Sequence, residues 1–389
     1  MKYNLVTIEV FDKFSNFKKS DWNKISKNQN PCLSYDFINL AELTGCASEQ
    51  TGWKPRHLAL FDYKGNLRAG MLLYEKYHSW GEYIFDFAWA QAYQNHNLSY
   101  YPKLISCIPF TPISSNKIFT ACPNDLTASI ELIQYAVKLT NTAYSSLHIH
   151  FIGLKESLLL ESQGLMTKMD CQFHWQNNNY LTFEDFLSTL KSKKRKKIKR
   201  ERKKLCENNI TFKWLKGSDV NKNQWNEIYD LISMTFYKKG SSPYFNYEFF
   251  VELSLNIPDK LLIITAEHNA KLIGASLFFV GNESLYGRYW GTDNNYDSLH
   301  FETCYYQGIE FCIKNKIKHF EPGTGGEHKI SRGFTASKTR SAHYLKHPDF
   351  STAVKRHLHI ESQNIERYIQ DVQKHSPYKT NNNCINRLA

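Results

Sequence analysis

The stretch that decides the fold runs from Gly287 to Phe334 and reads GRYWGTDNNYDSLHFETCYYQGIEFCIKNKIKHFEPGTGGEHKISRGF. An aromatic segment, Tyr286–Trp290, has strand character and leads through a polar loop into a helix expected over about 298–314. A second short strand is expected over 318–321, before a glycine-rich turn. Strand, helix and strand in this order predict a βαβ unit, which places polar loops together at strand ends.

Four titratable side chains in this stretch are the candidate catalytic residues. His300 and Glu302 stand at the start of the expected helix, and Glu327 and His328 follow the glycine turn. All four can exchange protons near neutral pH. Residues two apart do not share a helix face, so His300 and Glu302 need not act together. A helix cap or a hydrogen bond in the core remains the alternative for each.

The residues around the glycine turn are candidates for substrate binding. Backbone N–H groups of glycines that face one way can hold a carboxylate or a phosphate. Three further polar or aromatic side chains lie in the segment 81–93, which we expect to begin as a strand with its first two acidic residues on one face. The candidate substrate-binding residues are Gly325, Gly326, Lys329, Arg332, Trp290, Glu82, Asp86 and Trp89.

The positive charge of the chain is concentrated in one segment. The net charge is +12, and residues 191–204, KSKKRKKIKRERKK, hold eleven Lys or Arg and one Glu, so 11 − 1 = +10 lies there and 12 − 10 = +2 elsewhere. We expect this segment on a helix over about 183–205 that binds a polyanion such as tRNA. A solvated helix or a nuclear localisation signal remains open. The candidate polyanion-binding residues are Lys193, Lys194, Lys196, Lys197 and Arg200.

Length and pattern predict two domains. A chain of 389 residues exceeds a usual single core. The order helix, hairpin, strand, helix, strand is expected twice, in residues 1–178 and in residues 179–389, with the basic helix at the start of the second domain.

Other sequence features limit the location and chemistry. Nine cysteines without a CxxC pair favour a reduced compartment and argue against a zinc site. The N-terminal segment MKYNLVTIEVFDKF lacks the apolar run of a signal peptide, and no segment is apolar enough to span a bilayer. We therefore expect a cytoplasmic protein without a metal. P-loop, HExxH and GxSxG motifs are absent.

Several long motifs in one order resemble a known family. The segments are PCLSYDFINLAEL, TGWKPRHLAL, HSWGEYIFDFAWAQAY, YYPKLISCIPFTP, GRYWG, LHFETCYYQGIEF and FEPGTGGEHKISRGF. Together they resemble the bacterial FemAB-like "peptidoglycan biosynthesis/recognition" family of the acyl-CoA N-acyltransferase (GNAT) superfamily, over about residues 30–365. The resemblance implies an α/β protein with two tandem GNAT-like domains and mixed central sheets.

The resemblance also implies a reaction and its partners. It implies an N-acyltransferase that moves an acyl or aminoacyl group from acyl-CoA or aminoacyl-tRNA to the amine of an acceptor such as a peptidoglycan precursor. The chain lacks the R-x-x-G-x-G/A loop typical of coenzyme A binding and the long helical arm of some Fem ligases. Donor and acceptor therefore stay open. The alternative is a non-catalytic protein that binds nucleic acid or a cell-wall precursor through its basic helix.

Overall fold

The computed structural model describes residues 6–27, 30–294 and 296–379, so the first five residues of the N-terminal segment lie outside it. The strands of the first half are β1 (Thr7–Phe11), β2 (Trp53–Pro55), β3 (His57–Phe61), β4 (Leu67–Met71), β5 (Tyr74–Lys76), β6 (Lys103–Ser106), β7 (Ile118–Thr120), β8 (Ser146–Ile152) and β9 (Met166–Gln176). Its helices are α1 (Lys19–Ser26), α2 (Tyr35–Leu43), α3 (Phe87–Asn95), α4 (Leu126–Ala143) and α5 (Leu154–Ser162).

The second half contains the longest helix of the described chain. Its strands are β10 (Ile210–Lys216), β11 (Leu261–His268), β12 (Lys271–Val280), β13 (Ser284–Thr292), β14 (His319–Glu321) and β15 (Thr335–Leu345). Its helices are α6 (Phe183–Thr189), α7 (Ser192–Glu207), α8 (Lys222–Tyr237), α9 (Tyr247–Asn256), α10 (Leu299–Phe301), α11 (Gln307–Lys314) and α12 (Pro348–Lys374).

The strands form two sheets with both parallel and antiparallel pairs. One sheet has the order β1-β3-β4-β7, and an eleven-stranded sheet has the order β10-β11-β12-β13-β14-β9-β15-β8-β6-β5-β2. The pairs β6–β8 and β13–β14 are parallel, and each is connected through a helix. The expected mixed α/β fold with mixed sheets is therefore confirmed.

The same order of elements occurs in each half. An antiparallel edge strand, two helices and a hairpin (β1, α1, α2, β3–β4) in the first half correspond to β10, α8, α9, β11–β12 in the second. Both halves then contain a strand, a helix and a parallel strand: β6, α4 and β8 in the first, where β7 of the other sheet lies between β6 and α4, and β13, α10–α11 and β14 in the second. This duplication is the repeat that the sequence pattern predicts.

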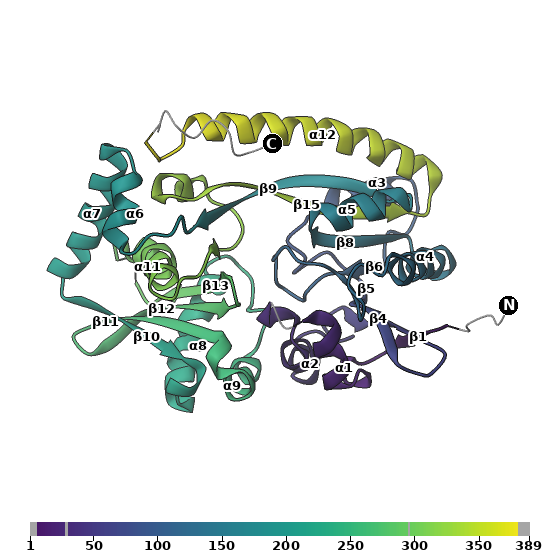
Figure 1. The fold of residues 1–389 in the computed structure, drawn as a ribbon, viewed down its shortest axis with the longest axis horizontal. Helices are drawn as coiled ribbons and strands as arrows, with labels where there is room; N and C mark the ends of the chain where they lie inside the picture. Colours follow the sequence, from purple (N-terminus) through teal and green to yellow (C-terminus); the bar gives the residue numbers. More distant parts are fainter. Residues whose placement is uncertain (1–5, 28–29, 295, 380–389) are drawn as a thin grey trace.

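The two halves exchange strands at their junction. Strand β15, from near the end of the chain, lies between β8 and β9 of the first half, and β9 in turn pairs with β14 of the second half. Figure 1 shows β9 reaching across both halves, with α12 lying along β9 and β15. One sheet thus crosses the predicted boundary between residues 178 and 179.

Aromatic packing joins the halves further. The ring of Phe37, on α2, meets the rings of Phe245, Phe249 and Phe279 at centroid distances of 5.6, 5.3 and 5.3 Å. These edge-to-face contacts add to the burial of large apolar area. The start of α2 fits the sequence, because the Ser34 hydroxyl accepts the Phe37 N–H as its cap.

Some expected elements differ in the structure. Residues 81–86 do not begin a strand: they form turns and bends before α3, whose Phe87–Asn95 range takes up the apolar residues of that segment. The basic helix is two helices, because Leu190 and Lys191 break it between α6 and α7. Among the described residues, no helix is long and apolar enough to cross a membrane.

Candidate functional site

A cavity lies where β13 and β14 stop pairing. Their parallel register covers Ser284↔His319, Leu285↔Phe320 and Tyr286↔Glu321. Beyond these pairs, Gly287–Trp290 of β13 and Pro322–Gly326 after β14 both line one cavity of about 490 Å³. We call this cavity the splay pocket. It brings together six of the sequence-predicted residues: Trp290, His300, Gly325, Gly326, His328 and Lys329.

A π-helical turn between α10 and α11 directs different side chains to different sides. The turn spans Glu302–Tyr306, and such turns are frequent at functional sites. His300, Cys304 and Tyr305 line the splay pocket, whereas Glu302 lines a separate cavity beside α7. The sequence argument that residues 300 and 302 do not share a helix face therefore applies here.

Two histidines in the splay pocket are neutral at pH 7. Burial, with a further contribution from His328, lowers the pKa of His300 to about 4. Burial also lowers the pKa of the His328 imidazole from its ordinary value. The Nε2 atom of His328 lies 2.9 Å from the Tyr305 hydroxyl, whose pKa burial raises, so the phenol stays protonated. An exposed imidazole held by a phenol can accept a proton near neutral pH.

The glycine turn is closed by a buried lysine. Lys329 Nζ donates to the carbonyl oxygens of Gly323 and Thr324 at 2.7 and 3.3 Å. Burial lowers its pKa to about 8. Gly325 and Gly326 have φ of +74° and +88°, which a side chain rarely adopts. The loop therefore presents backbone and one ammonium group to the pocket.

Glu302, a candidate catalytic residue from the same helix start as His300, lies outside the splay pocket. Its carboxylate is 2% exposed and accepts from Arg202 Nε at 3.1 and 3.2 Å and from Gln307 Nε2 at 2.8 Å. Burial raises the pKa of this carboxyl, while Arg202 opposes that shift. Because both oxygens are occupied, the carboxylate anchors α7 through Arg202.

Glu327 and Arg332 also lie outside the splay pocket. The exposed Glu327 accepts from the Tyr368 hydroxyl of α12 at 2.8 Å. Arg332 is 1% exposed and donates to Glu201 Oε1 and to the His328 carbonyl, both at 2.8 Å. Its guanidinium thus links the loop to Glu201 of α7 and fixes the main chain at His328.

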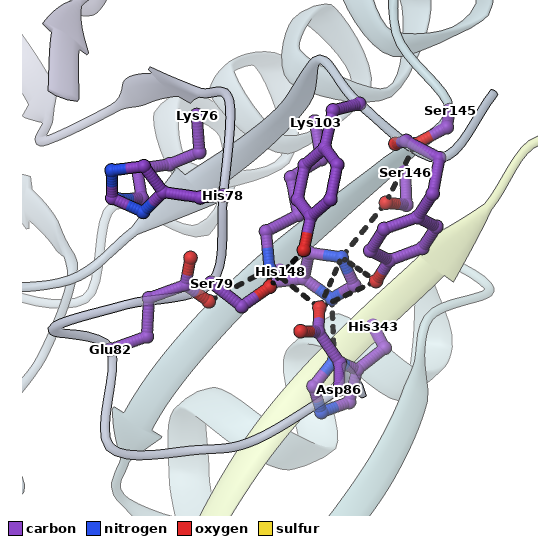
Figure 2. Close-up of polar contacts among 12 residues, drawn as sticks. Lys76, His78, Ser79, Glu82, Asp86, Lys103, Ser145, Ser146, His148 and His343 are labelled. Atoms are coloured by element: carbon purple, nitrogen blue, oxygen red, sulfur yellow. Dashed lines mark hydrogen bonds and ion pairs between the residues drawn. The ribbon is translucent and has the colours of Figure 1, made fainter. Parts of the chain in front are cut away.

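The three predicted residues of the first half belong to a different cluster. Figure 2 shows Glu82 and Asp86 converging on the buried Lys103, whose Nζ lies 2.8 Å from Glu82 Oε2 and 2.5 Å from Asp86 Oδ2. Burial raises the pKa of Glu82 to about 7, and although burial opposes ionisation of Asp86, Lys103 holds its pKa well below the usual range. Trp89 packs against His343 at a centroid distance of 5.0 Å.

The basic helix α7 is neutralised along only part of its length. Carboxylates pair with Lys199 and with residues of its C-terminal half that include Arg202 and Lys204. Lys197 lies 3.9 Å from Glu201. Within the described ranges, these cations form no ion pair: Lys193, Lys194, Arg195, Lys196 and Arg200.

Sequence reasoning missed Tyr305, Lys103 and the histidines behind Asp86. Tyr305 belongs to an apolar helical pattern in the sequence, and in the structure it lies in the π-helical turn with its hydroxyl beside His328. Lys103 and His343 are 240 positions apart in the sequence (343 − 103 = 240), so no local motif links them. The H-x-H spacing of His148 and His150 was the one signal available.

Comparison with solved structures places the fold among known proteins. FemX shares 10% sequence identity, with 86% of this chain and 98% of FemX covered at a TM-score of 0.54. The C-terminal domain of a protein named as a lysylphosphatidylglycerol synthetase from Agrobacterium fabrum shares 9% identity over 86% of this chain and 94% of its own, at 0.52. A conserved protein of unknown function from Bacteroides thetaiotaomicron shares 11% over 87% and 99%, at 0.51.

These likenesses show a shared fold. No curated protein matches the chain in sequence. The sequence does match the FemAB-like family, described as peptidoglycan biosynthesis/recognition, over residues 13–380. That match spans both halves, the splay pocket and the cluster around Lys103. The chain therefore belongs to the FemAB-like family.

Proposed function

We propose that the chain is an N-acyltransferase of cell-wall precursor metabolism and that the splay pocket is its catalytic centre. The observation that carries this proposal is the meeting of His328, Lys329 and the glycine turn where β13 and β14 stop pairing. Where the two strands part, main-chain N–H and C=O groups can bond a donor. Membership of the FemAB-like family supports an acyl-transfer role.

The reaction would be attack of an acceptor amine on the donor carbonyl. His328 is the base: with its Nε2–H donating to the Tyr305 oxygen, Nδ1 keeps a lone pair for the amine proton. The Lys329 ammonium or the N–H groups of Gly325 and Gly326 stabilise the oxyanion. The new C–N bond replaces the C–S bond of a thioester or the C–O bond of an aminoacyl ester, and His328 returns the proton to the leaving group.

Helix α7 would hold a polyanionic donor or acceptor. Cations in its first turn are unfavourable beside the helix dipole and face no acidic residue there, which suggests a binding role for them. Arg332 bonds Glu201 of α7 on one side and the His328 carbonyl on the other. A nucleic acid on α7 would thus lie beside the loop of the splay pocket, which favours aminoacyl-tRNA over acyl-CoA as donor.

A transfer assay tests the proposal. The purified chain is incubated with acyl-CoA donors, or with a mixture of aminoacyl-tRNAs, and with peptidoglycan precursors that carry a free amine. Mass spectrometry of the acceptor should show the added acyl or aminoacyl mass. Acceptor that stays unmodified with every donor, while still binding the chain, would favour the non-catalytic alternative.

A further inference from the structure

Three buried histidines meet on one face of the eleven-stranded sheet. His148 and His150 alternate onto the same face of β8, and His343 of β15 lies directly opposite His148 in the antiparallel register. The three side chains are at most 1% exposed, and one ligand nitrogen from each lies within 4.8 Å of the others. We propose that these three histidines bind a divalent transition metal ion, with zinc as the first candidate.

The supporting contacts resemble a prepared ligand set. The Nδ1 atoms of His148 and His343 face each other at 2.7 Å. On the opposite ring edges, Nε2 of His148 lies 2.8 Å from Ser146 Oγ, and Nε2 of His343 lies 2.8 Å from Ser341 Oγ. Metal-binding histidines commonly donate their second N–H to such a partner, which fixes the tautomer and the ring orientation.

The third histidine, His150, has a ring nitrogen that is free to bind a metal. Nδ1 of His150 is buried and has no hydrogen-bond partner among the residues that the structure describes. A buried polar atom without a partner is costly, and a metal ion would satisfy it. Three imidazoles and a water are a common ligand set for zinc.

The protonation state and the local charge suit a cation. Burial pushes the pKa of all three imidazoles below the ordinary value, so each is neutral at pH 7, as a metal ligand must be. Lys103 would repel the ion, but it is paired with Glu82 and Asp86. The trio of Lys103, Glu82 and Asp86 carries a net charge of 1 − 2 = −1 when both carboxyl groups are ionised. Figure 2 shows this trio beside His148 and His343.

Binding would need a shift of one proton and a small separation of two rings. The Nδ1 atoms of His148 and His343 lie 2.7 Å apart, whereas a tetrahedral zinc ion with Zn–N distances of about 2.0–2.1 Å holds its nitrogen ligands about 3.3 Å apart. In the metal-free arrangement the facing Nδ1 atoms of His148 and His343 share one proton. With the metal bound, that proton moves to the Nε2 atom of the same ring. This N–H then donates to the serine hydroxyl beside it, and both Nδ1 lone pairs face the ion. No proton has to leave the site.

The site would fasten the exchanged strand. His148 and His343 are 195 residues apart in the chain, and they belong to opposite halves. A metal bound between them would lock β15 against β8 and so hold the C-terminal part of the chain in the sheet of the first half. The chain has no CxxC pair and no HExxH motif, so its sequence predicted no metal; the H-x-H spacing of His148 and His150 matches neither pattern.

Metal analysis of three proteins tests this inference. Wild type, His343→Gln and a matched control, His357→Gln, whose histidine is exposed on α12, are incubated with excess zinc chloride and passed through gel filtration. We expect about one zinc ion per chain, the number that one ligand set holds, in wild type and in the control, and nearly none in H343Q. Circular dichroism checks that H343Q is folded.

A second measurement covers the case in which H343Q does not fold. Wild type stripped with a chelator should show a higher midpoint of thermal unfolding after zinc chloride is added, because a ligand of the folded state alone stabilises it. Wild type that holds no zinc and shows no such shift would overturn the inference. Equal zinc in folded H343Q and in wild type would overturn it as well.

Discussion

At the scale of single residues, the position of His328 depends on the lack of a side chain at residue 326. A Cβ atom at Gly326 would lie 2.4 Å from the His328 ring, whereas one at Gly325 would meet nothing within 4 Å. Both glycines have positive φ, so alanine strains the backbone by about 1–3 kcal/mol at either position. Only Gly326→Ala should also displace the imidazole.

We therefore expect Gly326→Ala to lower kcat about tenfold or more relative to Gly325→Ala, since a 1 Å displacement of a catalytic group can cost that much. The matched control Gly325→Ala carries the same backbone strain without the collision. Steady-state kinetics on both variants gives the ratio. Equal rates would show that His328 is not placed by the turn.

Glu302 should matter for stability rather than for the reaction. Glu302→Gln removes a charged partner of Arg202, which keeps only Glu310, so we expect unfolding free energy to fall by about 1–3 kcal/mol. Denaturant unfolding measures this loss, and Glu310→Gln, which removes the exposed partner of Arg202, is the control. A drop in kcat of about 10²-fold for Glu302→Gln with little change in stability would instead make Glu302 the base.

At the scale of elements, the sequence predicted most of the pieces that carry local signals. The strands β13 and β14 and the helix between them agree with the strand, helix and strand predicted around residues 286–321. The prediction of a strand over residues 81–86 was wrong. The alternating apolar residues there are typical of a strand, but the segment forms turns and bends in which Glu82 accepts a hydrogen bond from Lys103. A π-helical turn has no sequence pattern of its own, so Tyr305 could not be placed.

The unpaired part of α7 should govern binding of a polyanion. Charge reversal at Lys193, Lys194, Arg195 and Lys196 should weaken RNA binding and reduce the slope of log K against log salt by about 0.7–0.9 per lost phosphate contact. Reversal at Lys199, Lys203 and Lys204, which already pair with carboxylates, is the matched control and should have a smaller effect. Fluorescence anisotropy with labelled tRNA measures both. Equal effects would contradict a role for the unpaired end.

At the scale of the whole molecule, the exchange of strands could not be read from the sequence. The repeat was visible as a pattern, but pairing of β15 with β8 and β9 depends on contacts between distant segments. The same holds for the candidate site: the loop residues were predicted from their chemistry, while the exclusion of Glu302, Glu327 and Arg332 from the splay pocket could be seen only in the fold.

The division at residues 178 and 179 remains a prediction, and the exchange suggests that the parts depend on each other. A piece comprising residues 1–178 lacks β15, so β8 and β9 lose the strand between them. We expect this piece alone to show no cooperative thermal transition by circular dichroism, and co-expression with residues 179–389 to restore one. Cooperative unfolding of residues 1–178 alone would show an independent domain.

His328 of the splay pocket is the residue that we propose accepts the proton during acyl transfer. The most direct measurement is the single-turnover rate of wild type, His328→Gln and the control His319→Gln, whose histidine is exposed on β14, as a function of pH. We expect His328→Gln to be slower by about 10²–10⁴-fold. Because burial lowers the pKa of His328, the wild-type rate should fall only as pH drops below about 6.5, the ordinary histidine value, and this acid limb should vanish in the variant. A variant as fast as wild type, with the same acid limb, would show that His328 is not the base.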